Sequence, residues 1–405
     1  MGDATTAAAE SDERAAKPSL SMGCALFDDK DTATSGWCCR GDGDSTPRRF
    51  STPSELDPSV IWITNVAWAK YTDSIKSCSH IRLPTFYRVN LDMMMREIGF
   101  DPSALNVRDV VVALADILDR AWKLSTAAWE GLLADETMHE SIYKQARRRD
   151  PPDFDRIEQV MKTAYQDNSI VLGVKWEPGI ISVKFVPNRV RHVIDVTSIG
   201  IPSGAWAIKN EKTSVDDFLK IETPSFADCE ISMDGAALAD LLAYGVQYGG
   251  NGKSTLRQWI SQPEMLFLVE HAKIKQINSI LSFDQFESPP QLPDILLNDS
   301  MTALSYSAGV VAESFLVAYS GRRTSARHNF RPYHPPRAVW MKAVDRAISF
   351  GQARRLHECG IRVTGYGFGA VSAKVFAHEI NDAADIGADC GFFLMDGRYP
   401  HKNDE

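Results

Sequence analysis

Long segments with a helical spacing of apolar residues constrain the fold of this chain most. In the segment 106–133, apolar residues recur at three- and four-residue steps, which place them on one broad face of a helix. The segments 301–319 and 337–359 have the same character, and Gly360 is a suitable C-terminal stop for the last one. The segment 254–280 also has a helical character, interrupted by a proline. These segments predict a mainly helical framework.

A short β-rich region interrupts this framework. Two runs of β-branched and apolar residues, 170–176 and 180–186, flank Glu177-Pro178-Gly179. A Pro-Gly turn between two such runs predicts a β-hairpin. The sequence therefore predicts a mainly α protein, with two helical lobes, a small central β-hairpin element and a flexible N-terminal arm.

The first 57 residues differ in composition from the rest. They are rich in Ala, Ser, Thr, Asp and Gly and have few large apolar side chains before Val60, which predicts a flexible arm. The length of 405 residues allows two or three lobes. The expected division is an arm over 1–57, an N-terminal helical lobe over 58–168, a β-containing central segment over 169–230, a C-terminal helical lobe over 231–395 and a tail over 396–405.

Charge is distributed unevenly along the chain. The formal net charge is −9, but residues 322–374 hold nine Arg and two Lys against two carboxylates, a local charge of +9 that leaves −18 on the other residues. A basic segment attracts anions whatever the net charge of the protein. The segment therefore predicts contact with a polyanion. The alternative, in which these arginines pair with the chain's own carboxylates, stays open.

The first part of this basic segment, residues 321–337, combines guanidinium groups, two aromatic rings and several prolines. Arg forks pair with phosphates, and Phe330 or Tyr333 can stack on an unpaired base. Sequence-independent RNA binding needs this combination. The candidate RNA-binding residues are Arg322, Arg323, Arg327, Arg331, Tyr333 and Arg337, with Arg354 and Arg355 on the following helix.

A glycine-rich segment from Gly249 to Ser254 offers a different interpretation. Its Gly-Lys-Ser-Thr end matches a phosphate-binding loop, in which Lys253 would reach the β- and γ-phosphates of a nucleotide. The leading glycine of the pattern is replaced by Gln247, and the preceding segment has helical spacing where a strand is required. A P-loop NTPase or helicase-like protein is therefore an alternative.

Other signatures of catalysis and metal binding are missing from the sequence. The nine His are dispersed without metal-ligand spacing, and the seven Cys form no CxxC pair. We therefore expect no enzymatic activity, no cofactor and no metal site. No run of about 18 apolar residues exists, so we expect no membrane span. The scattered cysteines indicate a reducing intracellular compartment.

With these residues in view, the sequence resembles RNA-virus coat and nucleocapsid proteins, mainly over residues 254–358. The segment 255–258 (TLRQ) is similar to one in the coat proteins of flexuous filamentous plant viruses, where it opens a core helix. The segments 305–307 and 322–327 are similar to the RNA-clamping region of negative-strand virus nucleoproteins. The Ala-Phe-Asp-Phe segment of flexuous coats is absent, and residues 347–350 stand in its place.

The resemblance implies a helical two-lobed core, RNA in a basic groove and arms that bind neighbouring subunits. It favours a self-assembling capsid or nucleocapsid protein that packages viral RNA as a homo-oligomer, without catalysis or a membrane. Such a protein is expected in the virion and the host cytoplasm. A helical filament and an isometric shell both stay open. The alternatives are the P-loop NTPase and a non-enzymatic interaction protein whose basic segment docks an acidic partner.

Overall fold

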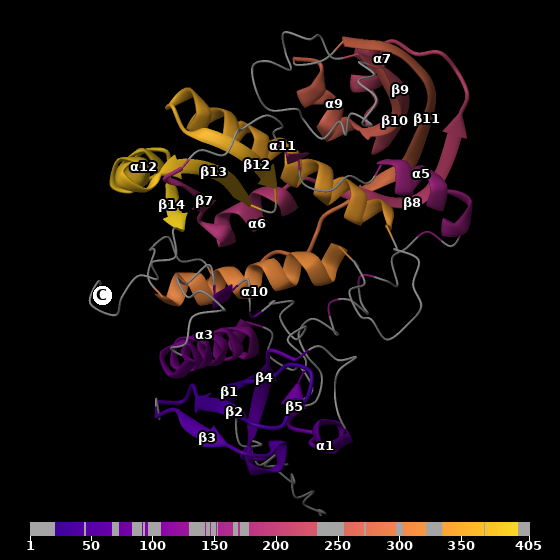
Figure 1. Cartoon of the computed structure of the whole chain (residues 1–405). Helices are drawn as coiled ribbons and strands as arrows, with labels where there is room; N and C mark the ends of the chain where they lie inside the picture. The colour runs from indigo at the N-terminus through magenta and orange to yellow at the C-terminus, as the bar shows by residue number, and fades with distance from the viewer. Residues whose placement is uncertain are drawn as a thin grey trace, which may run out of the picture.

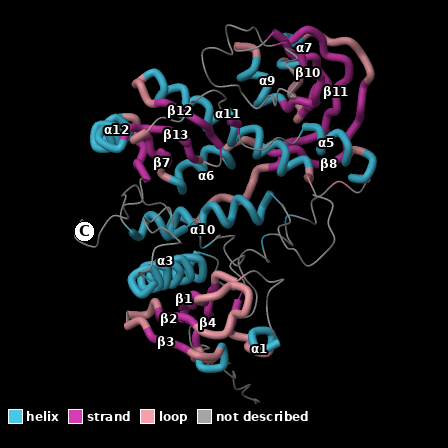
Figure 2. Tube along the Cα trace, viewed as in Figure 1, coloured by secondary structure: helices cyan, strands magenta, loops and turns pink. Residues whose placement is uncertain are grey.

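Over the residues that the structure describes, the protein is a mixed α/β structure with three β-sheets (Figure 1, Figure 2). The computed structural model describes residues 21–43, 46–66, 73–82, 91, 94–95, 107–128, 142, 146, 151, 153–164, 169–170, 178–232, 255–270, 273–296, 303–320, 334–367 and 369–395. The sheets have five, four and five strands in chain order.

The first sheet has the strand order β3-β2-β1-β4-β5. Its strands are β1 (Ser21–Phe27), β2 (Gly36–Arg40), β3 (Arg48–Phe50), β4 (Val60–Thr64) and β5 (Ile81–Arg82). The first three strands pair antiparallel, whereas β4 runs parallel to β1 and β5 runs parallel to β4. Parallel neighbouring strands need a crossover connection, whereas antiparallel neighbours can be joined by a short turn. The sheet therefore combines an antiparallel meander of β1, β2 and β3 with crossover connections at β4 and β5.

Both faces of β1 are covered, which explains why its residues from Met22 to Phe27 are all buried. Met22, Cys24 and Leu26 pack in the core cluster that includes helix α3 (Val107–Ala128). The alternate residues Ala25 and Phe27 pack on the opposite side of the sheet. This alternation is the period of two that a strand requires.

The second sheet is antiparallel throughout, with the order β10-β9-β11-β8. Its strands are β8 (Ile201–Lys209), β9 (Ser225–Ser232), β10 (Thr255–Ser261) and β11 (Lys273–Glu287). The short helices α7 (Val215–Leu219) and α9 (Gln262–Leu268) share a core cluster with this sheet.

The third sheet is also antiparallel, with the order β14-β7-β13-β12-β6. Its strands are β6 (Ser169–Ile170), β7 (Ile180–Pro187), β12 (Arg362–Gly367), β13 (Ala370–Phe376) and β14 (Phe392–Met395). Apolar residues on one face of the sheet pack in a core cluster with residues of α11 (Pro336–Glu358) and α12 (Ile380–Asp389).

Helix α10 (Ala303–Ser320) lies between the first and third sheets (Figure 1). It packs against α3 on one side and against α6 (Arg189–Thr197) on the other, as Figure 1 shows. Since it contacts elements on opposite sides, it is apolar around most of its circumference. The remaining short elements are α1 (Asp73–Lys76), α5 (Glu158–Ala164) and the 3₁₀ turns Pro53–Glu55, Phe154–Arg156, Asp294–Leu296 and Ala377–Glu379.

The expectation of a mainly α fold with two helical lobes is wrong, because three sheets form much of the core. The expected flexible N-terminal arm is also wrong for residues 21–50, which contain β1, β2 and β3. The proposed boundaries near residues 57, 168, 230 and 395 are not tested by these elements and stay predictions. Among the described helices, none has the length and apolarity needed to span a membrane.

Individual segments explain where the expectation fails. The long helices α3, α10 and α11 are confirmed. The second run of the expected hairpin forms β7, which pairs with β13 and β14 from the C-terminal part of the chain, and residues 171–177 of the expected hairpin lie outside the described residues. The segment 254–280, for which a helix is predicted, instead forms β10, α9 and the first half of β11. Strand pairing here joins residues far apart in sequence, and local spacing does not reveal it.

Candidate functional site

A buried polar cluster lies where the β12–β13 turn meets α6 and α11. Asp345 of α11 is 3% exposed. Its Oδ1 lies 2.8 Å from His192 Nε2 and accepts a hydrogen bond from the Gly369 backbone N–H at 3.2 Å. Ser349 Oγ donates to the same oxygen at 3.3 Å, and Lys342 Nζ lies 3.3 Å from Oδ2. We call these five residues the Asp345 cluster.

Helical spacing explains how α11 contributes three members of the cluster. Lys342, Asp345 and Ser349 follow one another at steps of three and four residues, so they share one face of the helix. All three are buried. A buried carboxylate is tolerated when donors surround it and an opposite charge balances it. Both conditions are met here.

The β12–β13 turn brings its backbone close to the imidazole. Gly369 has φ +63°, a conformation that favours glycine. A Cβ atom at this position would lie 2.7 Å from His192 Cδ2. A side chain here would therefore displace the imidazole, so the turn requires glycine for both its backbone angle and its close contact.

The two ring nitrogens of His192 differ: Nε2 contacts Asp345, and Nδ1 is buried without a hydrogen-bond partner among the described residues. It is 5% exposed and lies in the first turn of α6, whose N-cap Asn188 accepts a hydrogen bond from the Arg191 N–H at 3.0 Å. If Nε2 donates to Asp345, Nδ1 carries the lone pair, and Nδ1 has no hydrogen-bond partner among the described residues. An imidazole oriented by a carboxylate, with a free lone pair, is suited to accept a proton.

The third sheet carries a basic face. Lys184 of β7, Lys374 of β13 and Arg362 of β12 come from three adjacent strands, and Arg362 pairs directly with Lys374 in the register. The described strands of this sheet contain no Asp or Glu. The alternate residues Val183 and Ala373 face the core shared with α11 and α12, so the three cations lie on the opposite face.

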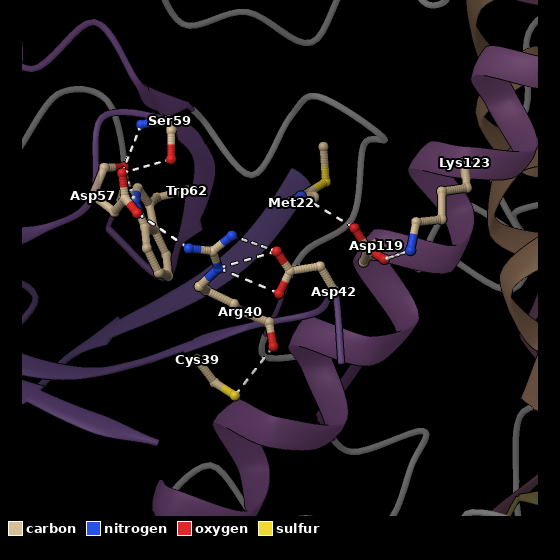
Figure 3. A network of polar contacts seen from close by, with 9 residues as sticks. All are labelled: Met22, Cys39, Arg40, Asp42, Asp57, Ser59, Trp62, Asp119 and Lys123. Carbon is tan, nitrogen blue, oxygen red and sulfur yellow. Dashed lines mark hydrogen bonds and ion pairs between the residues drawn. The ribbon is translucent and has the colours of Figure 1, made fainter. Parts of the chain in front are cut away.

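A second polar network, shown in Figure 3, stabilises the first sheet. Arg40 bridges Asp42 at 2.5 Å and Asp57 at 3.2 Å. Hydrogen bonds from Arg40 hold the pKa of Asp42 below its usual value, and the side chain and backbone N–H of Ser59 do the same for Asp57. Because these groups are paired at the surface, we interpret the network as structural.

A buried carboxylate in the same network ties the first strand to its helix. Asp119 of α3 is 1% exposed and accepts a hydrogen bond from the Met22 N–H at 3.2 Å, while Lys123 Nζ lies 2.6 Å from its other oxygen (Figure 3). In the part of the chain that the structure describes, no group of three or more His, Cys, Asp or Glu could hold a metal ion.

The structure describes only three of the residues predicted to bind RNA. Arg337 is buried and donates from Nε to the Tyr319 carbonyl at 2.9 Å, which ties the start of α11 to the end of α10. Arg354 is exposed and pairs with Glu358 at 2.9 Å, and Arg355 is exposed. The structure does not bring Arg337 together with the other two on one surface. Arg322, Arg323, Arg327, Arg331 and Tyr333 lie outside the described residues, as does the loop from Gly249 to Ser254.

Sequence reasoning missed the Asp345 cluster and the basic face. One local signal was available: Lys342, Asp345 and Ser349 fall on one face of the helix expected over 337–359. His192 gave no signal, because it lies 153 positions from Asp345.

Comparison with known proteins gives matches only at the level of structure. No family model and no curated protein matches the sequence. Phi29 DNA polymerase complexed with single-stranded DNA has a TM-score of 0.49 and 11% identity, covering 88% of this chain and 80% of that chain. The same polymerase in its ternary complex with primer-template DNA and incoming nucleotide substrates has a TM-score of 0.44 with the same identity and coverage. The family B DNA polymerase from the hyperthermophilic archaeon Pyrobaculum calidifontis has a TM-score of 0.31 and 13% identity, covering 93% and 56%.

These findings correct the functional expectation. The expected RNA-virus coat or nucleocapsid protein is wrong, because the helical two-lobed core that it implies is absent from the described residues, where the fold is mixed α/β. The P-loop NTPase and the non-enzymatic interaction protein are not supported either. The expectation of no enzymatic activity is withdrawn: the solved structures that this chain resembles are those of DNA polymerases, with TM-scores below 0.5. The expected partners, viral RNA and further copies in a capsid, are withdrawn with it; one phi29 DNA polymerase structure that this chain resembles is a complex with primer-template DNA.

Proposed function

We propose that this chain is an enzyme that acts on nucleic acid, with the third sheet as binding surface and His192 as proton acceptor. One arrangement supports this proposal. A carboxylate-oriented imidazole, whose buried Nδ1 has no hydrogen-bond partner among the described residues, lies at the end of a sheet that carries three cations and, in its described strands, no carboxylate.

The basic face would hold the phosphate backbone. Lys184, Arg362 and Lys374 lie on three adjacent strands, at the spacing of about 4.8 Å per strand that a sheet imposes. Cations without interleaved carboxylates attract a polyanion, and the contacts made are independent of base sequence.

The His192–Asp345 pair would move a proton. Chemistry at phosphorus with a hydroxyl or water as nucleophile needs a proton acceptor, and a positioned side chain commonly fills this role. Nδ1 of His192 would take the proton, and Asp345 would stabilise the imidazolium that forms through its contact with Nε2. Lys342 balances the charge of Asp345 in the absence of substrate.

Binding is tested by fluorescence anisotropy with labelled DNA over a series of salt concentrations. Replacing Lys184, Arg362 and Lys374 together by Gln should weaken binding and lower the salt slope by about 2.7 for duplex DNA or about 2.1 for a single strand. Lys275→Gln is the matched control, because Lys275 is an exposed cation on the second sheet, paired with Glu230. An unchanged slope in the triple variant would contradict the proposed binding face.

Catalysis is tested with primer-template DNA and nucleotides, the ligands named in the polymerase complexes above. His192→Gln keeps a donor for Asp345 but removes the basic nitrogen, so turnover should fall by about 10²–10⁴-fold at unchanged DNA affinity. His378→Gln, at an exposed histidine, should leave turnover unchanged. Full activity of His192→Gln, or a wild type that neither binds nor converts these ligands, would refute the proposal.

Further phosphate contacts are proposed for the segment between α10 and α11. Arg322, Arg323, Arg327 and Arg331 lie there, with Tyr333 as a stacking residue. Their replacement by Gln is measured in the same anisotropy assay. Each phosphate contact removed should lower the salt slope for duplex DNA by about 0.9.

A further inference from the structure

Two cysteines meet at the ends of the helices that cover the third sheet. Cys359 is the C-cap of α11 and Cys390 is the C-cap of α12. Their sulfur atoms lie 3.7 Å apart, although the residues are separated by 31 positions. A disulfide needs about 2.05 Å between the sulfurs, so a side-chain rotation of modest size would bring them into bonding distance.

Both cysteines occupy well-defined helix ends. The Cys359 N–H donates to the Arg355 carbonyl at 3.2 Å, and the Cys390 N–H donates to the Ile386 carbonyl at 3.1 Å. A glycine with positive φ follows each cysteine, which is the usual way for a helix to end. The two side chains therefore start from fixed backbone positions, and the short distance between them is a property of the fold.

We propose that Cys359 and Cys390 are a redox-modification site that closes into a reversible disulfide when a small disulfide such as glutathione disulfide is the oxidant. Cys359 is exposed and within reach of the oxidant, whereas Cys390 is 8% exposed and lies behind it. The other described cysteines are less suited. Burial raises the pKa of the Cys24 and Cys229 thiols, which keeps both protonated and unreactive.

The reaction proceeds by two thiol–disulfide exchanges. The Cys359 thiolate attacks one sulfur of glutathione disulfide, forms a mixed disulfide and releases one glutathione thiolate. Cys390 then loses its proton to solvent, attacks the Cys359 sulfur and releases the second glutathione. Two protein thiols are oxidised and one glutathione disulfide is reduced to two glutathione molecules. Burial and the contact with Cys359 raise the pKa of Cys390, so the exposed Cys359 makes the first attack and Cys390 reacts only once the mixed disulfide lies beside it.

The disulfide would crosslink α11 and α12, the two helices that cover the third sheet. Strand β12 begins three residues after Cys359, and β14 begins two residues after Cys390. The disulfide would therefore fix the starting points of two strands of this sheet and join α11, which carries Asp345, to α12.

The test is oxidation of the full chain in a glutathione redox buffer, followed by peptide mapping. We expect a mass loss of about 2 Da and a crosslinked peptide that contains Cys359 and Cys390. The oxidised protein should melt at a higher temperature than the reduced one, and reductant should reverse the shift. Cys390→Ser should stop at a mixed disulfide with glutathione on Cys359.

Cys78→Ser is the matched control, because Cys78 is the other described cysteine that is not fully buried. This variant should form the same crosslink as the wild type. A wild type that carries only glutathione adducts, or a crosslink that forms only under denaturing conditions, would overturn the proposal.

Discussion

The ion pair between Arg346 and Glu264 gives the sharpest prediction of stability. Arg346 of α11 is 0% exposed and Glu264 of α9 is 1% exposed, and their side chains are in direct contact. Next to the pair, Phe267 packs on Phe350 with ring centroids 4.3 Å apart. The pair therefore lies in the interface between the second sheet's helix and the third sheet's covering helix.

Glu264→Gln would leave a buried guanidinium without its counter-charge. Removing one partner of a buried pair costs about 3–5 kcal/mol, because the remaining charge stays desolvated. Replacing both residues by apolar side chains of similar size, as in Glu264→Leu with Arg346→Met, should recover most of this loss. Arg354→Gln is the control. It breaks an exposed pair with Glu358, and such pairs contribute about 0–1 kcal/mol.

The assay is urea unfolding of each variant, followed by tryptophan fluorescence, with the free energy of unfolding taken from the transition. We expect the wild type and Arg354→Gln to have nearly the same free energy of unfolding. The double variant should be close to them, and Glu264→Gln should be the least stable. If Glu264→Gln loses no more than Arg354→Gln, water must reach Arg346. If the double variant is as unstable as Glu264→Gln, the cost arises from packing. Either result refutes the electrostatic reasoning.

Three further predictions address the Asp345 cluster, helix α6 and the first sheet. Gly369→Ala should lose about 1–3 kcal/mol of unfolding free energy in the same assay, because the new Cβ meets His192 and the backbone has positive φ. Asn188→Ala removes the N-cap of α6 and should cost about 1 kcal/mol in urea unfolding. Hydrogen bonds from Arg49 lower the pKa of Asp28 in the folded state. The stability that this pair contributes is therefore present above the ordinary carboxyl pKa of about 3.9 and is lost as the pH falls below it. Arg49→Gln should shift the midpoint of acid unfolding to higher pH, measured by circular dichroism.

The long helices were predictable because their signal is local. Helix α10 and helix α11 present apolar residues over 18 and 23 residues, a length that excludes strands. The strand β10 was not predictable in the same way. Its buried residues Gln258 and Ile260 alternate with the less buried Arg257 and Trp259, but the run is short and leads directly into α9, so a helical spacing fits it as well.

The first sheet was not predicted because many of the large side chains that pack on β1 and β2 come from β4 and α3. Besides Met22, Leu26, Phe27 and Trp37, the strands β1 and β2 contribute mainly small residues, and a Cβ on Gly23 would lie 2.6 Å from the Trp62 ring. The large apolar side chains that cover these strands come from β4 and α3. A composition rich in small residues is typical of a flexible segment when judged alone. It is equally suited to a strand that a tryptophan and a long helix enclose.

The net charge of one sequence segment could not locate the proposed binding surface. Residues 322–374 carry a net charge of +9, but Arg337 and Arg346 are buried. Arg337 donates a hydrogen bond to the Tyr319 carbonyl, and Arg346 forms an ion pair with Glu264. A buried charge that is paired contributes little to the field outside. Lys184 lies 190 residues before Lys374, outside this segment, and only the sheet register places them on one face. The external field of this protein therefore depends on strand order, which assembles cations from separate segments, more than on the density of arginine along any one stretch of chain.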